Sequence, residues 1–123
     1  MKGQLIHFEI AAEDPSRLAD FYHNVLGWNI GEPQAEMGDY RIIQPPGDGD
    51  AIGGGLYKKT EPSQGRVDYF DVESIEESSE MVRQNGGQVI VEKMAVPKMG
   101  YFALCLDPEG NPFGLWLTDE NAA

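Results

Sequence analysis

Near its start the chain reads Leu5-Ile-His-Phe-Glu-Ile10, and this stretch begins a unit that the chain uses twice. Its side chains alternate with a period of two, which is the pattern of a strand with one buried face. Phe8 and Ile10 lie on the apolar face, whereas His7 and Glu9 lie on the opposite, mixed face. The stretch therefore predicts a strand that presents a histidine and a carboxylate on the side away from the core.

A helix is predicted directly after this strand. Asp14 is a good N-cap, Pro15 suits the first helical position, and Gly27 is a typical helix stop. Apolar residues recur between them at helical spacing and are expected to pack on a sheet: Leu18, Phe21, Tyr22, Val25 and Leu26. Three short strands should follow at residues 28–30, 40–44 and 51–57, with a turn at residues 45–49. The first half thus has the order βαβββ.

The second half repeats this order at an offset of about sixty residues. Gly27-Trp-Asn-Ile30 falls on Gly87-Gln-Val-Ile90, Gly54 falls on Gly114, and His7 falls on Val67. After a loop at residues 58–65, the expected elements are a strand at 66–72, a helix that starts with a capping box at Ser74 and stops at Gly86, and strands at 88–92, 100–106 and 113–118. The prediction is one α+β domain over residues 1–123, with modules at about 4–58 and 66–119 that share one curved mixed sheet.

Composition narrows the classes of partner. The 123 residues are enough to bury a core without a disulfide, and the one cysteine, Cys105, is expected to be a buried structural thiol in a reducing cytoplasm. Twenty-one acidic and nine basic residues give a net charge of −12, which disfavours nucleic acid and anionic lipid as partners. No apolar run is long enough to span a bilayer, so no membrane association is expected.

A family resemblance rests on four features of the chain. They are the His7 strand, the Asp14-Pro15 helix start, the motif Phe21-Tyr22-x-x-Val25-Leu26-Gly27-Trp28, and the turn Asp107-Pro-Glu-Gly-Asn111. Together they resemble the glyoxalase/bleomycin-resistance/extradiol-dioxygenase superfamily, also called the vicinal oxygen chelate superfamily. The resemblance implies a cup-shaped sheet made of two modules, with the helices on its outer face, and commonly a homodimer. An unrelated ferredoxin-like α+β dimer is the weaker alternative, because it leaves the duplicated three-strand tail unexplained.

In metal enzymes of this superfamily, ligands on the sheet hold one divalent ion that polarises the substrate. The resemblance carries those ligand positions onto His7, Gly54, Val67 and Gly114, and only His7 has a donor side chain. A metal centre is therefore disfavoured, although a two-ligand site made of His7 and Glu9 remains as an alternative. His23 is predicted to lie on the exposed side of the first helix.

The predicted function follows from these missing ligands. Gly54 and Gly114 are interpreted as open space for a ligand, and the surrounding positions on the same face form a mixed aromatic and polar lining: His7, Glu9, Tyr69, Asp71 and Trp116. The first hypothesis is a metal-free module that binds a small organic molecule through His7, Glu9, Gly54, Tyr69, Gly114 and Trp116. The second is an enzyme, either a metal-dependent lyase, isomerase or dioxygenase or a metal-independent catalyst in which His7 is the base and Glu9 orients it.

Overall fold

A computed structural model describes residues 3–35, 38–47, 49–61 and 64–123. Asp48 of the predicted 45–49 turn, and Pro62 and Ser63 of the predicted 58–65 loop, lie outside these residues. The chain divides into two compact units, one formed by His7–Val67 and the other by Asp68–Ala123 with the residues up to Ile6. The expectation of a single domain over the whole chain stays a prediction.

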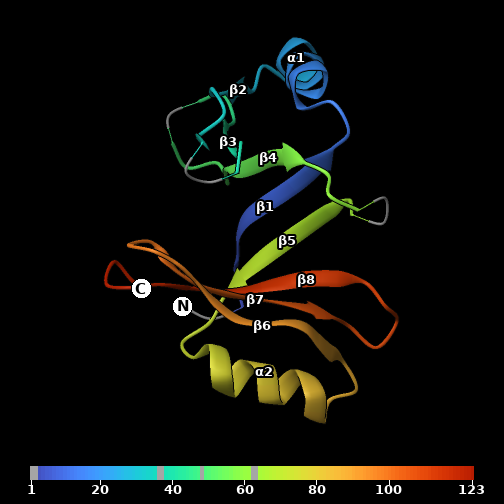
Figure 1. Cartoon of the computed structure of the whole chain (residues 1–123), viewed down its shortest axis with the longest axis vertical. Helices are drawn as coiled ribbons and strands as arrows, with labels where there is room; N and C mark the ends of the chain where they lie inside the picture. The colour runs from blue at the N-terminus through green and yellow to red at the C-terminus, as the bar shows by residue number, and fades with distance from the viewer. Residues whose placement is uncertain (1–2, 36–37, 48, 62–63) are drawn as a thin grey trace. The chain divides into compact units, whose positions relative to one another are not determined.

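The His7–Val67 unit contains the first βαβββ set (Figure 1). Its elements in chain order are β1 (Leu5–Ala12), α1 (Pro15–Leu26), β2 (Asn29–Ile30), β3 (Arg41–Gln44) and β4 (Gly54–Lys58). The strand order is β2-β3-β4-β1, with β1 parallel to β4 and the other neighbours antiparallel. The predicted strand and helix order of the first half is confirmed, with boundaries that differ by a few residues.

The second unit repeats the same plan. Its elements are β5 (Arg66–Asp71), α2 (Ile75–Gln84), β6 (Gln88–Val96), β7 (Gly100–Leu106) and β8 (Pro112–Thr118). The strand order β5-β8-β7-β6 again has one parallel pair, β5 with β8, followed by antiparallel pairs. Figure 1 shows α2 running alongside this sheet. The α+β fold class with two βαβββ sets is therefore confirmed.

Both helices begin at the caps that the sequence predicts. The Asp14 side chain accepts a hydrogen bond from the Arg17 backbone N–H at 3.1 Å, and the Ser74 hydroxyl accepts one from Glu77 N–H at 3.1 Å. Gly27 ends α1 with a φ of 74°, a left-handed conformation that favours glycine. Within the described residues, neither helix is long and apolar enough to cross a membrane.

The core of the His7–Val67 unit corrects one expectation about α1. The buried residues are Phe8, Ile10, Ala12, Ala19, Ile43 and Leu56, and Leu18, Tyr22, Trp28 and Ile30 pack against them. The helix therefore meets the sheet through Leu18, Ala19 and Tyr22. The rest of the predicted apolar stripe does not pack as expected, since Phe21, Val25 and Leu26 are 54%, 61% and 48% exposed.

The second core lies between α2 and its sheet. Its buried residues are Ile75, Ala103, Cys105 and Leu115. The structure confirms that Cys105 is buried, and burial raises the pKa of its thiol. A protonated thiol in an apolar setting is a poor nucleophile, so Cys105 is a core residue.

Candidate functional site

The mixed face of β1 carries a cluster of polar and aromatic side chains. The strand register pairs Glu9 with Gly55, and neighbouring positions of paired strands share a face. His7 and Glu9 therefore lie on the same side of the sheet as Tyr57. Tyr40, at the entrance to β3, joins them, and its ring is nearly parallel to those of His7 and Tyr57.

Tyr40 bridges His7 and Glu9 through its hydroxyl. The Tyr40 Oη lies 2.7 Å from His7 Nε2 and donates to Glu9 Oε2 at 2.8 Å, while His7 Nε2 and Glu9 Oε2 are 3.9 Å apart. Because the phenol has one proton and gives it to the carboxylate, its oxygen must accept from His7. The geometry thus assigns the Nε2–H tautomer to His7 and leaves Nδ1 as the acceptor nitrogen of the ring.

The cluster is partly buried, and burial controls its protonation. The side chains of His7 and Glu9 are 34% and 18% exposed, so a ligand can still reach them. Desolvation lowers the pKa of His7 below 6.5, and the nearby Glu9 charge only partly offsets this effect. Burial, and then the Glu9 carboxylate, raise the pKa of Tyr57. At neutral pH the cluster therefore contains a neutral imidazole at His7 and a neutral phenol at Tyr57.

This depressed pKa predicts a stability change with pH. Since the folded-state pKa of His7 lies below the unfolded value near 6.5, the unfolded chain binds more protons between the two values. The contribution of His7 to stability is complete above about pH 6.5 and is lost as the pH falls through the folded pKa. Urea denaturation of the wild type and of His7→Gln at several pH values measures this contribution. A difference between the two proteins that stays constant from about pH 7.5 to 5 would contradict it.

Gly55 is the residue that makes room for Tyr40. A Cβ atom at Gly55 would overlap both the hydroxyl and the ring of Tyr40. Sequence reasoning missed Tyr40, Tyr57 and Gly55 as site residues. The signal was present for Tyr40, because it is the first residue of the predicted strand 40–44, but the partner of that strand could not be read from the chain.

Gly54, which was expected beside His7, lies on the other face. It pairs with Phe8 in the parallel register, and a side chain there would meet the Phe8 carbonyl and ring. The expectation that Gly54 opens space on the His7 face is therefore wrong, because a shift of one residue exchanges the faces of a strand. Gly55 occupies the place that Gly54 was expected to take.

The other predicted ligand-binding residues belong to the second unit. Tyr69 pairs with Gly114, and its ring fills the volume that a side chain at Gly114 would need. Tyr69 itself is buried and meets Phe102 edge to face. The space expected above Gly114 is thus occupied by the protein's own ring. A role in ligand binding for Tyr69 and Gly114 remains a prediction.

Trp116 and Asp71 lie side by side on the same face of this unit. They are register partners on β8 and β5. The Trp116 indole N–H donates to Thr118 Oγ1 at 2.9 Å, and its ring covers Gly100. The Asp71 carboxylate accepts from the Gln4 backbone N–H at 2.9 Å. Both side chains therefore have structural contacts, and ligand binding by Trp116 also remains a prediction.

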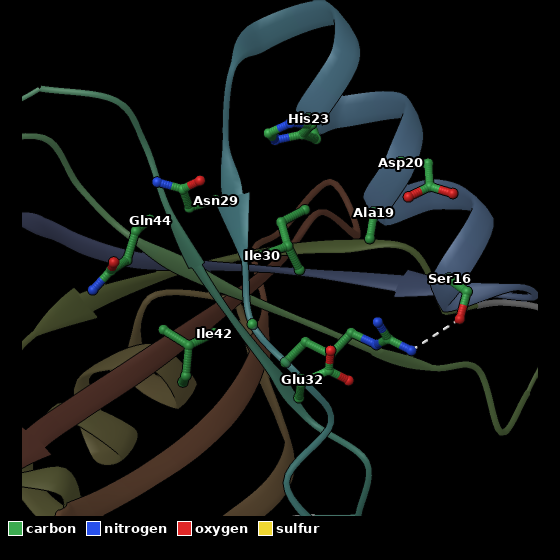
Figure 2. A pocket seen from close by; sticks show the side chains of 11 residues that line it. Ser16, Ala19, Asp20, His23, Asn29, Ile30, Glu32, Ile42 and Gln44 are labelled. Atoms are coloured by element: carbon green, nitrogen blue, oxygen red, sulfur yellow. Dashed lines mark hydrogen bonds between the residues drawn. The ribbon is translucent and has the colours of Figure 1, made fainter.

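A separate hollow of about 820 Å³ lies between α1 and the β2–β3 hairpin (Figure 2). Arg41 belongs to its lining, and one guanidinium N–H donates to Ser16 Oγ at 3.0 Å. His23 is exposed, as predicted, and lines the same hollow, where its Nδ1 lies 2.9 Å from the Trp28 carbonyl oxygen. Sequence reasoning did not single out this hollow.

Comparison with known proteins identifies the family. The model of the Glyoxalase/Bleomycin resistance protein/Dioxygenase superfamily matches residues 4–115. The chain belongs to this superfamily. CFP32 of Mycobacterium bovis, named as a glyoxylase, is 31% identical over 117 residues, which are 92% of this chain. The match spans only 43% of the mycobacterial protein. A glyoxylase-like domain-containing protein of Didymella fabae is 29% identical and is matched over 91% of its own length.

Solved structures agree with the superfamily fold. Methylmalonyl-CoA epimerase from Mycobacterium tuberculosis superposes with a TM-score of 0.68 at 18% identity, covering 95% of this chain and 88% of the epimerase. The protein BH1468 from Bacillus halodurans gives 0.69 at 20% identity and covers 98% of both chains. These identities are low, so the superpositions support the glyoxalase-superfamily fold alone.

The metal that the superfamily often uses does not fit the donors near His7. Within the described residues, no group of three or more His, Cys, Asp or Glu side chains is arranged to hold an ion. His7 and Glu9 form the pair nearest to such a site, but the Tyr40 hydroxyl lies within hydrogen-bond distance of both His7 Nε2 and Glu9 Oε2, and the tautomer assigned above places a proton on Nε2. A catalytic ion needs about three protein ligands, which this pair does not supply.

Proposed function

We propose that the protein binds a small organic molecule on the His7 face of its His7–Val67 unit. The observation that carries this proposal is the half-buried network of His7, Tyr40 and Glu9. It combines fixed hydrogen-bonding groups with the aromatic surface of Tyr40 and Tyr57, which is the usual composition of a small-molecule site. The network uses two residues that the sequence singled out, His7 and Glu9, and joins them through one that it did not.

Charge defines the class of ligand. Glu9 accepts a hydrogen bond in this network, and the whole chain carries a net charge of −12. The site should therefore favour a neutral or cationic ring compound over a polyanion. The solved structure of a methylmalonyl-CoA epimerase contains methylmalonyl-CoA, and the phosphates of such an ester would be repelled by this chain.

Removing the Tyr40 hydroxyl tests the network directly. We expect Tyr40→Phe to weaken binding of a neutral or cationic ring compound about 5- to 20-fold, since His7 and Glu9 lose the hydroxyl that holds them in place. A fragment library of such compounds, screened by NMR line broadening, supplies the probe. Tyr22→Phe is the matched control, because Tyr22 packs on the α1 side of the sheet. Equal affinities for wild type and Tyr40→Phe would refute the assignment of the His7–Tyr40–Glu9 network as the binding site.

We further propose that this binding requires no resident metal. The measurement is elemental analysis of untagged protein, followed by anaerobic addition of zinc, nickel, manganese and iron(II). Fragment affinities should be unchanged by a chelator. Near-stoichiometric metal that is lost in His7→Ala would instead support the metal-dependent lyase, isomerase or dioxygenase alternative.

A metal-independent acid–base enzyme is the second candidate. The observation in its favour is the state of His7, whose lowered pKa and assigned tautomer provide an imidazole base at neutral pH. Glu9 would orient the ring through Tyr40. The test follows deuterium incorporation from D2O into carbon acids, with methylmalonyl-CoA included among them. Incorporation that is lost in His7→Gln but retained in Tyr22→Phe would favour the enzyme over the binding module.

Two predictions about the setting of the protein remain to be measured. A homodimer and a cytoplasmic location are both expected from the family resemblance and composition. Sedimentation velocity at several protein concentrations tests the first, and cell fractionation tests the second.

A further inference from the structure

The hollow between α1 and the β2–β3 hairpin is chemically separate from the His7 cluster. Arg41 pairs with Leu56 in the antiparallel register, so it lies on the core side of the sheet, whereas its neighbour Tyr40 lies on the His7 side. The volume of the hollow, about 820 Å³, is within the range of small-molecule sites. Tyr40 and Arg41 are therefore adjacent in the chain but lie on opposite faces of the sheet.

The Arg41 guanidinium is the cation of this hollow, and it is incompletely paired. Its one hydrogen bond is to the neutral Ser16 hydroxyl, and no carboxylate of the described residues lies within ion-pair distance of it. Its Nε–H is also buried without an acceptor. A buried donor without a partner is unfavourable, so the guanidinium can still accept an incoming hydrogen-bond acceptor as its partner.

Negative charges line the same hollow without neutralising Arg41. Asp20 comes from α1 and Glu32 follows β2, and Figure 2 shows both carboxylates beside the hollow. Neither makes a hydrogen bond or an ion pair within the described part of the chain. Ser16 of α1 and Ile30 of β2 belong to the same lining.

We infer that this hollow binds a small zwitterion, with a carboxylate held by Arg41 and a protonated amine held by Asp20 and Glu32. Arginine presents a planar fork that matches a carboxylate, and the two acids match an ammonium group. A ligand with both charges satisfies the guanidinium and the acids at once, whereas a simple anion would be repelled by Asp20 and Glu32.

NMR titration with small amino acids tests this inference. The probes are L-alanine, β-alanine and 4-aminobutyrate, which differ in the separation of their charges, with propionate and propylamine as singly charged controls. We expect saturable shifts of the Arg41 Nε–H signal and of the Glu32 backbone amide with one of the zwitterions. That zwitterion should bind at least about tenfold more tightly than propionate or propylamine.

Variants of the lining separate the two halves of the site. Arg41→Gln should abolish saturation, and Asp20→Asn with Glu32→Gln should bring the zwitterion down to the affinity of propionate. Asp20 is exposed on α1, so its replacement leaves folding intact. Arg17→Gln, on the same helix but outside the hollow, should bind as the wild type does. Linear, non-saturable shifts with every probe, or saturation that survives both Arg41→Gln and the double acid variant, would overturn the inference.

Discussion

Gly55→Ala is expected to destabilise the protein by about 1–3 kcal/mol and to disrupt the His7–Tyr40–Glu9 network at the same time. The added Cβ would occupy the position of the Tyr40 hydroxyl and ring, so that ring must leave its place. His7 and Glu9 then lose the group that bridges them. Urea denaturation measures the first effect, and the NMR titration of the His7 ring measures the second.

Gly65→Ala is the matched control for this substitution. Gly65 has open space where the Cβ would be placed, and its backbone does not need glycine. Its replacement should change the free energy of unfolding by less than about 0.5 kcal/mol and leave the His7 titration unchanged. If Gly55→Ala behaves like Gly65→Ala in both measurements, Tyr40 does not occupy the position that the network requires.

Leu56→Ala should produce the largest loss of stability, about 2–5 kcal/mol. Leu56 is completely buried on β4, where it pairs with Ile10 and contributes to the core under α1. Truncation removes its transfer free energy and leaves a cavity that strands on both sides prevent from collapsing. Guanidinium or urea denaturation monitored by circular dichroism gives the difference in the free energy of unfolding between the wild type and Leu56→Ala.

Leu26→Ala makes the same chemical change at the end of α1, where the leucine is 48% exposed. The free energy of unfolding should fall by less than about 1 kcal/mol, because little apolar surface is returned to water and alanine is a good helix former. Equal losses for the two leucine variants would show that the α1 stripe is buried after all, as the helical spacing alone suggests.

Local features were predictable because their causes are local. Asp14, Pro15 and Gly27 define the ends of α1 through capping and backbone conformation, which depend on neighbours a few residues away. The alternation around Phe8 correctly separated the core face of β1 from the face of His7 and Glu9. The repeat at an offset of sixty residues likewise predicted two βαβββ sets, since each set carries its own strand and turn signals.

The candidate site was only partly predictable, because it depends on which strands meet and in what register. His7 and Glu9 share one strand, so their common face followed from the sequence. Tyr40 joins them through pairing across 31 and 33 residues, and no local pattern records that contact. The same register places Gly55, not Gly54, beside Glu9.

By itself the sequence determined the order of elements, the helix ends, the acidic surface and the faces of single strands. Tertiary structure alone decided the Tyr40 bridge, the filling of the space above Gly114 by Tyr69, and the exposure of Phe21 on α1. The physical reason is that sequence periodicity indicates which side chains share a face of a strand or helix. Strand pairing, and the way a helix crosses its sheet, then decide which residues contact that face.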